Sequence, residues 1–146
     1  MLSTTAQYAL RALGCLASRG DGVVILGREL AEETGVPASY LSKVLLVLNR
    51  AGLVEATRGT GGGYRLAKPP EEIALIEIVG PIDDVGRLEE CLMGLGECSE
   101  QDPCAMHDWW HRVRRDYLEM LRQTSLAEVT RKEGSTEART EMGDDQ

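Results

Sequence analysis

Long apolar segments are absent from this 146-residue chain. The longest uninterrupted apolar run, 44–48, is far shorter than the roughly 18 to 20 residues that a helix needs to cross a bilayer. The start of the chain also lacks the basic region and apolar core of a secretory signal. These absences argue against a membrane-spanning protein, and we expect a cytoplasmic one.

A catalytic pattern of residues is absent as well. No nucleophile is paired with a base, and no set of carboxylates has a catalytic pattern. The glycine-rich segment 58–63 does not match a phosphate-binding loop. It lacks a Gly-Lys-Ser or Gly-Lys-Thr ending, and it leads to strand residues and Pro69-Pro70 instead of a helix. We therefore predict that the protein is not an enzyme.

Cysteine is scarce outside one short stretch: only Cys15 lies elsewhere, and we expect it to be an inert core thiol. The stretch holds Cys91, Cys98 and Cys104, followed by His107. In a reducing cytosol, clustered cysteines are more often metal ligands or redox-active thiols than structural disulfides. Thiolates and imidazole suit zinc or an iron–sulfur cluster, so the stretch predicts a metal site with four protein ligands.

The two halves of the chain differ in charge, although the net charge is −8. Residues 1–70 hold eight Lys or Arg and five Asp or Glu, whereas residues 71–146 hold eight and nineteen. A local basic face is enough for contacts with DNA phosphates, and an acidic remainder limits nonspecific binding. The distribution is compatible with a DNA-binding head joined to an acidic body.

The first half has the pattern of a helix-turn-helix. Thr4 and Gln7 have the spacing of a capping box, and the apolar pattern and turn residues predict helices over 4–18, 28–34 and 37–51. Such an arrangement presents the start of its second helix to the major groove. The residues expected to face DNA are Ser39, Tyr40, Ser42 and Lys43. An ordinary helical hairpin with a solvated polar face is the alternative.

A β-hairpin is predicted directly after the third helix, and it favours the DNA-binding interpretation. Its strands are expected over 53–57 and 64–67, with the loop 58–63 between them. Such a hairpin is a wing, in which arginines supply cations and glycines let the backbone approach the DNA surface closely. The wing residues expected at the DNA are Arg58, Gly59, Gly61, Gly62 and Arg65.

The second half is predicted to hold a connector and a dimerisation helix. A short apolar helix is expected around 73–79, and glycines and a proline leave the ligand stretch as a loop. A long helix over 105–123 carries apolar residues that suit the shared core of a two-fold dimer. Trp109 and Trp110 are expected to pack in that core or on the loop, and His111 to lie on a polar surface.

The predicted fold class is thus mainly α with a small β-hairpin. The winged helix-turn-helix head spans 1–70, and the connector helix, cysteine loop and long C-terminal dimerisation helix span 71–130. One more helical turn is expected at 126–129. We expect the charged segment 131–146 to be a disordered acidic tail, because it has almost no apolar residues.

The chain resembles the Rrf two-type family of bacterial winged-helix regulators over about residues 1–130. The resemblance is carried by TTAQYAL at 4–10, SYLSK at 39–43, RGTGGGY at 58–64 and the three-cysteine stretch. It implies a homodimeric transcription factor, often a repressor, that binds double-stranded DNA at a palindromic operator. It also implies that operator affinity changes when an iron–sulfur cluster is lost, oxidised or nitrosylated.

Within that family, the ligand pattern is similar to the IscR branch, where a histidine three residues after the third cysteine completes the site. Cys104 and His107 reproduce that step, so the resemblance implies His107 as the fourth ligand. The nitric-oxide-sensing branch uses an acidic residue on the first helix, for which this chain has no counterpart near Gln7. Cys91 and Cys98 are separated by six residues, one more than the IscR pattern has. A 2Fe-2S cluster is favoured over 4Fe-4S.

Two other classes stay open. One is a structural-zinc or thiol-switch winged-helix regulator, which would use the same side chains without a cluster. The other is an interaction module that has lost DNA binding. A zinc site would be colourless and would survive oxidants that destroy an exposed cluster, so colour discriminates between the metal-bound alternatives.

Overall fold

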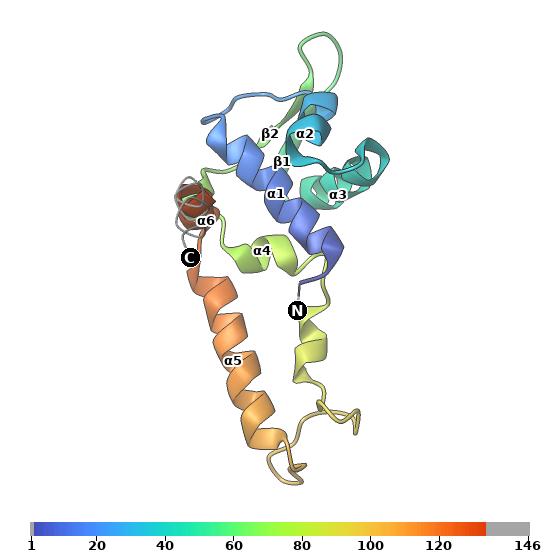
Figure 1. The fold of residues 1–146 in the computed structure, drawn as a ribbon, viewed down its shortest axis with the longest axis vertical. Helices are drawn as coiled ribbons and strands as arrows, with labels where there is room; N and C mark the ends of the chain where they lie inside the picture. The colour runs from blue at the N-terminus through green and yellow to red at the C-terminus, as the bar shows by residue number, and fades with distance from the viewer. Residues whose placement is uncertain (1, 134–146) are drawn as a thin grey trace, which may run out of the picture.

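The computed structural model describes residues 2–133 (Figure 1). Residue 1 and residues 134–146, to which most of the expected disordered tail belongs, lie outside the described residues. The described chain is mainly helical with one two-stranded antiparallel sheet, so the predicted fold class is confirmed. Within this range, no helix combines the length and the apolar character that a membrane crossing requires.

Three helices form the head: α1 (Thr4–Ser18), α2 (Gly27–Thr34) and α3 (Ala38–Arg50). Gly35 ends α2 in the left-handed conformation, at φ 70°, where glycine carries no Cβ penalty. The predicted helix-turn-helix is present, with α3 as its second helix. The cap of α1 is Ser3 instead of Thr4, because the Ser3 hydroxyl accepts the Ala6 N–H at 3.1 Å.

The wing is a hairpin of β1 (Val54–Thr57) and β2 (Gly63–Leu66), which pair antiparallel. Tyr64 in β2 also exchanges two backbone hydrogen bonds with Ile25, at 2.8 and 2.9 Å, which tie the wing to the segment before α2. A Cβ on Gly63 would stand 2.3 Å from the Ile25 carbonyl oxygen. Glycine at this position therefore permits the close approach of the two backbones.

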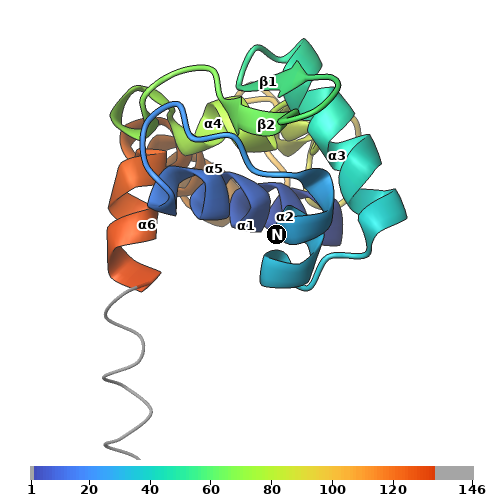
Figure 2. The ribbon, with the colours of Figure 1, turned by 90° about the horizontal axis from the view of Figure 1, so that it is seen from above.

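The second half of the chain packs on the head and shares its core. It contributes the 3-10 turn η1 (Pro70–Glu72) and the helices α4 (Leu75–Val79), α5 (His107–Gln123) and α6 (Leu126–Glu133). The Leu126 N–H donates to the Ile73 carbonyl at 2.8 Å and joins the start of α6 to the segment before α4. Figure 2 shows α1 between α6 on one side and α3 on the other. The largest fully buried side chains are Leu13, Leu16, Ile25, Leu30, Leu41, Leu45, Leu48, Leu53, Ile73, Ile78, Leu121 and Leu126.

Helix α6 continues into the segment that the sequence predicted to be a disordered tail, since residues 131–133 are helical. Val129 packs against the core, and the Thr130 hydroxyl donates to the Leu126 carbonyl at 2.8 Å. The Arg131 guanidinium donates to the Ala127 carbonyl at 3.3 Å. Packing of α6 on α1 stabilises this last turn, which its polar composition alone does not predict.

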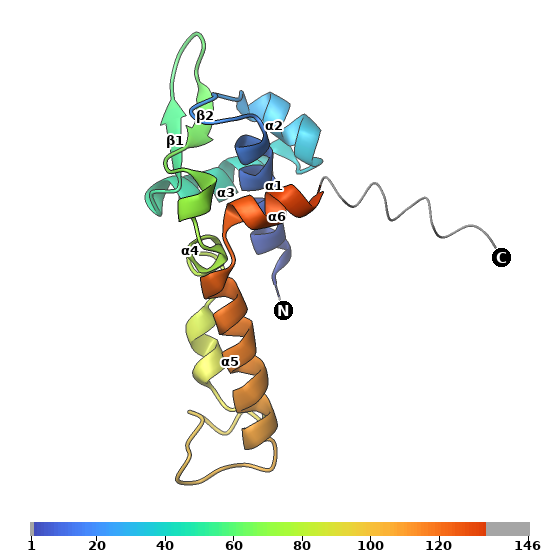
Figure 3. The ribbon, with the colours of Figure 1, turned by 90° about the vertical axis from the view of Figure 1, so that its left-hand side faces the viewer.

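Residues 85–106 form an arm that we call the cysteine arm. It begins with the 3-10 turn η2 (Val85–Glu89) and continues as the loop that carries the three cysteines. Helix α5 projects away from the head, and the cysteine arm runs beside it (Figures 1 and 3). The indole N–H of Trp110 donates to the Glu90 carbonyl at 2.9 Å, so this bond fastens the cysteine arm to α5.

Candidate metal centre and nucleic-acid interface

The four predicted ligands come together where the cysteine arm meets the start of α5. Cys91 Sγ lies 3.5 Å from Cys104 Sγ, and Cys98 Sγ lies 3.2 Å from His107 Nδ1. All four side chains line one cavity of about 170 Å³. The sequence-predicted ligands are thus two pairs of donor atoms around a common space.

The donors do not converge on one point. Among residues 2–133, no group of three or more His, Cys, Asp or Glu side chains has an arrangement that could hold one metal ion. On a tetrahedral metal with bonds of about 2.3 Å to sulfur and about 2.0 Å to nitrogen, two sulfurs stand roughly 3.8 Å apart and a sulfur and a nitrogen roughly 3.5 Å apart. The separations within the two pairs are close to these values, so each pair suits one metal ion.

Backbone N–H groups surround the Cys91 sulfur. Hydrogen bonds from the N–H groups of Met93 and Leu95 are the largest influences on its pKa; together with the Gly94 N–H they lower it, against the opposing effect of burial. The Gly94 N–H also closes the turn by donating to the Cys91 carbonyl at 2.9 Å. Metals bind the thiolate and not the thiol, so this turn prepares Cys91 to act as a ligand.

The neighbouring thiol, Cys104, is shifted in the opposite direction. The Met106 N–H is the largest single influence and acts to lower its pKa. The hydrogen bond with Cys91, burial, and the negative charges of Cys91 and Cys98 together outweigh it and raise the pKa of Cys104. Like charges this close disfavour one another, and a cation between the sulfurs would remove that penalty.

His107 is the first residue of α5 and is buried, with 8% of its surface exposed. Its backbone N–H donates to the Cys104 carbonyl at 3.0 Å. Helix α5 begins at His107, two residues after the predicted start at Ala105. The ring stacks on His111, with centroids 5.9 Å apart and planes at 28°. His111 is half-buried, whereas the sequence predicted that it lies on a polar surface.

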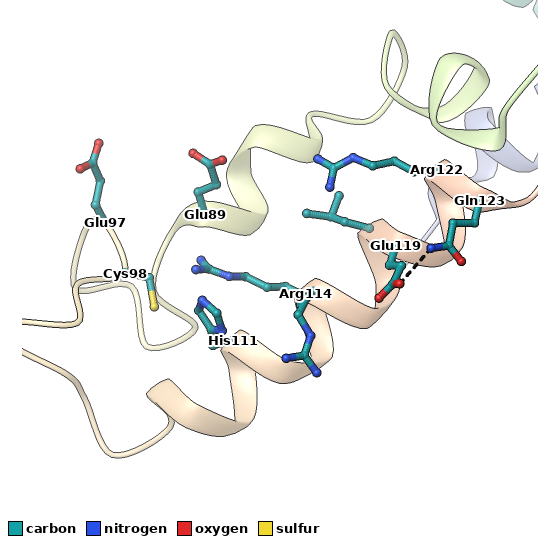
Figure 4. Close-up of a pocket in the computed structure, with 10 residues that line it drawn as sticks. Glu89, Glu97, Cys98, His111, Arg114, Glu119, Arg122 and Gln123 are labelled. Carbon is teal, nitrogen blue, oxygen red and sulfur yellow. Dashed lines mark hydrogen bonds between the residues drawn. The ribbon is translucent and has the colours of Figure 1, made fainter.

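A wider pocket of about 640 Å³ lies between the cysteine arm and α5 (Figure 4). Cys98 lines it from the arm and His111 from the helix, among acidic and basic side chains that include Glu97 and Arg114. Cys98 borders both this pocket and the smaller ligand cavity, whereas Cys91 is buried. Cys98 is therefore the one of the four donors that lines both the wider pocket and the smaller cavity.

Two side chains that position the cysteine arm were not identified as such from the sequence. Trp110 was expected to pack on the loop or in the dimer core, but its bond to the Glu90 carbonyl was not foreseen. Arg114 donates to the Leu88 carbonyl at 3.2 Å. A half-buried tryptophan needs a partner for its N–H, and that need is the one signal the sequence offered.

The start of α3 is exposed, as a DNA-contacting segment requires; the exposed side chains there include Ser39, Tyr40, Ser42 and Lys43. Tyr40 also faces α1. Its ring lies edge-on to Tyr8, with centroids 5.3 Å apart, and its hydroxyl is hydrogen-bonded to the Thr5 hydroxyl. Tyr40 is 38% exposed, so the same ring joins α3 to α1 and presents an edge to solvent.

The two wing arginines differ in their surroundings. Arg65 is held by Glu55 on the neighbouring strand, with Nη2 and Oε2 2.6 Å apart. Arg58 is exposed, and within the described part of the chain no ion pair involves it. Arg58 and Ser42 line a groove of about 420 Å³ between α3 and the wing. Of the two, Arg58 is the cation more available to a phosphate or a base.

The wing glycines also differ. Gly59 and Gly61 are exposed at positive φ, with open space where a Cβ would be. Gly62 is buried, and a Cβ there would stand 2.3 Å from the Thr57 carbonyl oxygen. Its missing side chain therefore serves the turn itself, which argues against a direct approach of Gly62 to DNA.

A winged helix-turn-helix head with an exposed second helix and wing defines the class as a DNA-binding transcriptional regulator. The chain belongs to the Rrf2 family: the family model, described as an iron-dependent transcriptional regulator, matches residues 2–132. The family and the relatives compared are regulators of transcription. The prediction that the protein is not an enzyme is therefore confirmed.

Three similar proteins, two of them solved structures, match this chain over most of their length. The HTH-type transcriptional regulator IscR of Photobacterium profundum is 31% identical over 131 residues, which cover 89% of this chain and 75% of that protein. The structure of CymR, the global cysteine regulator of B. subtilis, has a TM-score of 0.75 at 26% identity and covers 89% of this chain and 95% of that one. The structure of T. potens IscR has a TM-score of 0.70 at 25% identity, covering 100% of this chain and 93% of that one.

Proposed function

We propose that the protein is a homodimeric transcriptional repressor that senses iron–sulfur status, oxidants or nitric oxide. Its sensor is an iron–sulfur cluster, 2Fe-2S in preference to 4Fe-4S, held by Cys91, Cys98, Cys104 and His107. The observation that carries the proposal is the grouping of these four donors as two pairs around one cavity. Two donors for each of two metal ions is the protein ligation that a 2Fe-2S cluster requires.

The surroundings of the donors suit such a cluster. Backbone N–H groups at Cys91 are partners that a metal-bound thiolate retains, since hydrogen bonds to sulfur are compatible with ligation and tune the reduction potential. A single zinc ion needs all four donors at one point, which the paired arrangement does not favour. When bound, a cluster supplies an oxidant-sensitive redox centre. The named residues hold it, and the Cys98 side gives small molecules access.

The proposed dimer uses the exposed apolar side of α5. The residues on this side, on one stripe at helical spacing, are Met106, Trp109, Val113 and Met120. Large apolar side chains on one helix face are typical of a protein–protein interface. Trp110 and Arg114 face the cysteine arm instead, so a second copy of α5 can pack against the stripe without displacing the arm.

The proposed DNA contacts combine the start of α3 with the wing. Ser39, Ser42 and Lys43 are exposed for the major groove, and Arg58 extends the surface toward the minor groove. A two-fold dimer presents two such surfaces, which suits a palindromic operator in double-stranded DNA. The acidic body does not prevent DNA binding by the basic head, because phosphate contacts depend on local charge.

A thiol switch without a cluster is the second candidate, and one distance favours it. The 3.5 Å between Cys91 Sγ and Cys104 Sγ leaves a short movement to a disulfide of about 2.05 Å. The lowered pKa of Cys91 suits a thiolate that reacts with an oxidant. In this alternative, Cys98 and His107 have no ligand role.

The proposal is tested by comparing the DNA affinity of cluster-loaded and cluster-free protein. The probe is a fluorescein-labelled duplex that the wild-type protein selects from a random-sequence pool, measured by anisotropy under argon. We expect the two forms to differ by roughly 5- to 150-fold, the usual size of coupling between two sites. Equal affinities would refute the sensing role. A difference seen instead between reduced and peroxide-treated metal-free protein would favour the thiol switch.

A further inference from the structure

One carboxylate joins the base of the cysteine arm to the DNA-binding head. The Ser3 N–H donates to Asp83 Oδ2 at 3.0 Å, and the Ser3 hydroxyl donates to Asp83 Oδ1. Ser3 is the cap of α1, whereas Asp83 lies in the segment between α4 and η2. A negative charge at the amino end of a helix is favourable, so Asp83 holds the start of α1 by charge as well as by hydrogen bonds.

The start of α1 is in turn bound to the recognition helix. The Thr5 hydroxyl is hydrogen-bonded to the Tyr40 hydroxyl, and the Tyr8 ring packs edge-on against the Tyr40 ring. Tyr40 is the third residue of α3, within the segment that faces DNA. Asp83 therefore lies two contacts from the DNA-facing surface, through Ser3 and the first turn of α1.

Asp83 is also connected, through η2, to the part of the cysteine arm that carries Cys98. Its carbonyl accepts the Val85 N–H at 2.7 Å where η2 begins, and at the other end of η2 the Glu89 carbonyl accepts the Cys98 N–H at 3.0 Å. On α5, burial first and the negative charge of Asp83 second raise the pKa of Tyr117. Asp83 thus links the head to the base of the cysteine arm.

We propose that Asp83 is the positioning residue through which the state of the cysteine arm sets the placement of the recognition helix. This inference rests on the proposed function, because it concerns how a change at the four ligands reaches DNA. Gain or loss of a bound group at Cys98 changes the arm, and η2 transmits the change to Asp83. Asp83 then holds or releases the start of α1, and with it the contacts of Thr5 and Tyr8 to Tyr40.

The test is a comparison of Asp83→Ala with Asp84→Ala. Asp84 is the adjacent carboxylate, is exposed, and makes no hydrogen bond to the head within residues 2–133, so it is a matched control. For wild type and each variant, anisotropy with the selected duplex gives the affinities of the cluster-loaded and cluster-free forms. The visible spectrum confirms that each variant takes up the cluster, and circular dichroism confirms its fold.

The decisive quantity is the ratio of the two affinities, because a purely structural loss would weaken both forms alike. We expect the wild-type ratio, roughly 5- to 150-fold, to fall to within about twofold of one in Asp83→Ala and to be unchanged in Asp84→Ala. If Asp83→Ala does not fold, Thr5→Val removes the downstream hydrogen bond at constant size and should lower the ratio in the same way.

The outcomes separate this inference from the function on which it rests. A wild-type ratio of one would refute the sensing role and the linkage together. A large wild-type ratio that a folded Asp83→Ala retains would refute the linkage alone, as would an unchanged ratio in Thr5→Val where that variant is the one measured. A ratio that falls equally in Asp84→Ala would also overturn the assignment, because it would show a general effect of charge in this segment.

Discussion

The Sγ of Cys98 lies 3.2 Å from Nδ1 of His107, across the gap between the cysteine arm and the first turn of α5. This pair is distinct from the Cys91–Cys104 pair, and Cys98 also forms part of the wall of the wide pocket beside α5. Under the proposed function, this pair joins the arm to the helix and is placed to respond to a change in the bound cluster.

His107→Ala is expected to abolish stable cluster binding, because it removes one of two donors from a metal ion. The matched control is His111→Ala, since that ring stacks on His107 but contacts no sulfur among the described residues. Iron and sulfide per monomer, measured after anaerobic reconstitution and gel filtration, check the prediction. A His107→Ala protein that retains wild-type iron and absorbance would remove His107 from the ligand set.

Arg58→Ala is expected to weaken DNA binding by roughly 1 to 3 kcal/mol if the guanidinium reads a base, and by less if it touches only phosphate. Arg58 is exposed on the wing and lines the groove beside α3. Arg87→Ala, an exposed arginine on the cysteine arm, is the control and should change little. Anisotropy titrations at several salt concentrations distinguish a base contact from a phosphate contact. If the DNA affinity of Arg58→Ala equals that of wild type, Arg58 makes neither contact.

Trp109→Ala is expected to weaken the proposed dimer by at least about 2 kcal/mol, roughly thirtyfold in the dissociation constant, as for a central aromatic anchor. The side chain is 63% exposed in one copy of the chain, so its loss should cost the monomer little. Val23→Ala, an exposed apolar residue in the loop after α1, serves as the control. Sedimentation equilibrium measures both, and an unchanged dimer in Trp109→Ala would place the interface elsewhere.

Glu77→Gln is expected to lower the free energy of unfolding at neutral pH by about 1 kcal/mol, a value reduced for solvent screening because the pair is about one-third exposed. The hydrogen bond from Lys68 first, and the Ala74 N–H second, lower the pKa of Glu77 from 4.5. A lowered folded-state pKa means that this stabilisation is present above the unfolded value and is lost as pH falls through the folded one.

The stability difference between wild type and Glu77→Gln should therefore shrink as the pH drops below about 4.5, the ordinary pKa of this carboxyl. Glu72→Gln, in the exposed turn η1 nearby, is the matched control and should show no such narrowing. Urea unfolding followed by circular dichroism at a series of pH values gives both differences. If the difference in unfolding free energy between wild type and Glu77→Gln stays constant down to pH 3, the assigned ion pair between Lys68 and Glu77 is contradicted.

Local signals in the sequence predicted the head well. Gly35 ends α2, apolar spacing marks α3, and the glycine-rich loop separates the two strands, so each boundary depends on neighbouring residues. The extra turn of α6 was missed because it is stabilised by packing on α1, at the other end of the described chain. A polar segment carries no local sign of such a contact.

The candidate site was predictable in composition and not in arrangement. The residue types and the crowding of Cys91, Cys98, Cys104 and His107 indicated ligand chemistry, but a loop without periodicity does not reveal which donors pair. The link between Ser3 and Asp83 joins residues eighty positions apart, and neither has a distinctive sequence context. Tyr40 was predicted to face DNA, yet its bond to Thr5 depends on how α1 and α3 cross.

The proposed sensing depends on an iron–sulfur cluster held by Cys91, Cys98, Cys104 and His107. It is tested most directly by purifying the protein without oxygen, recording its visible spectrum, and measuring iron, sulfide and zinc per monomer. We expect a coloured protein with about two iron and two sulfide per monomer and little zinc. A colourless protein with stoichiometric zinc, or one that binds no metal after reconstitution, would contradict it.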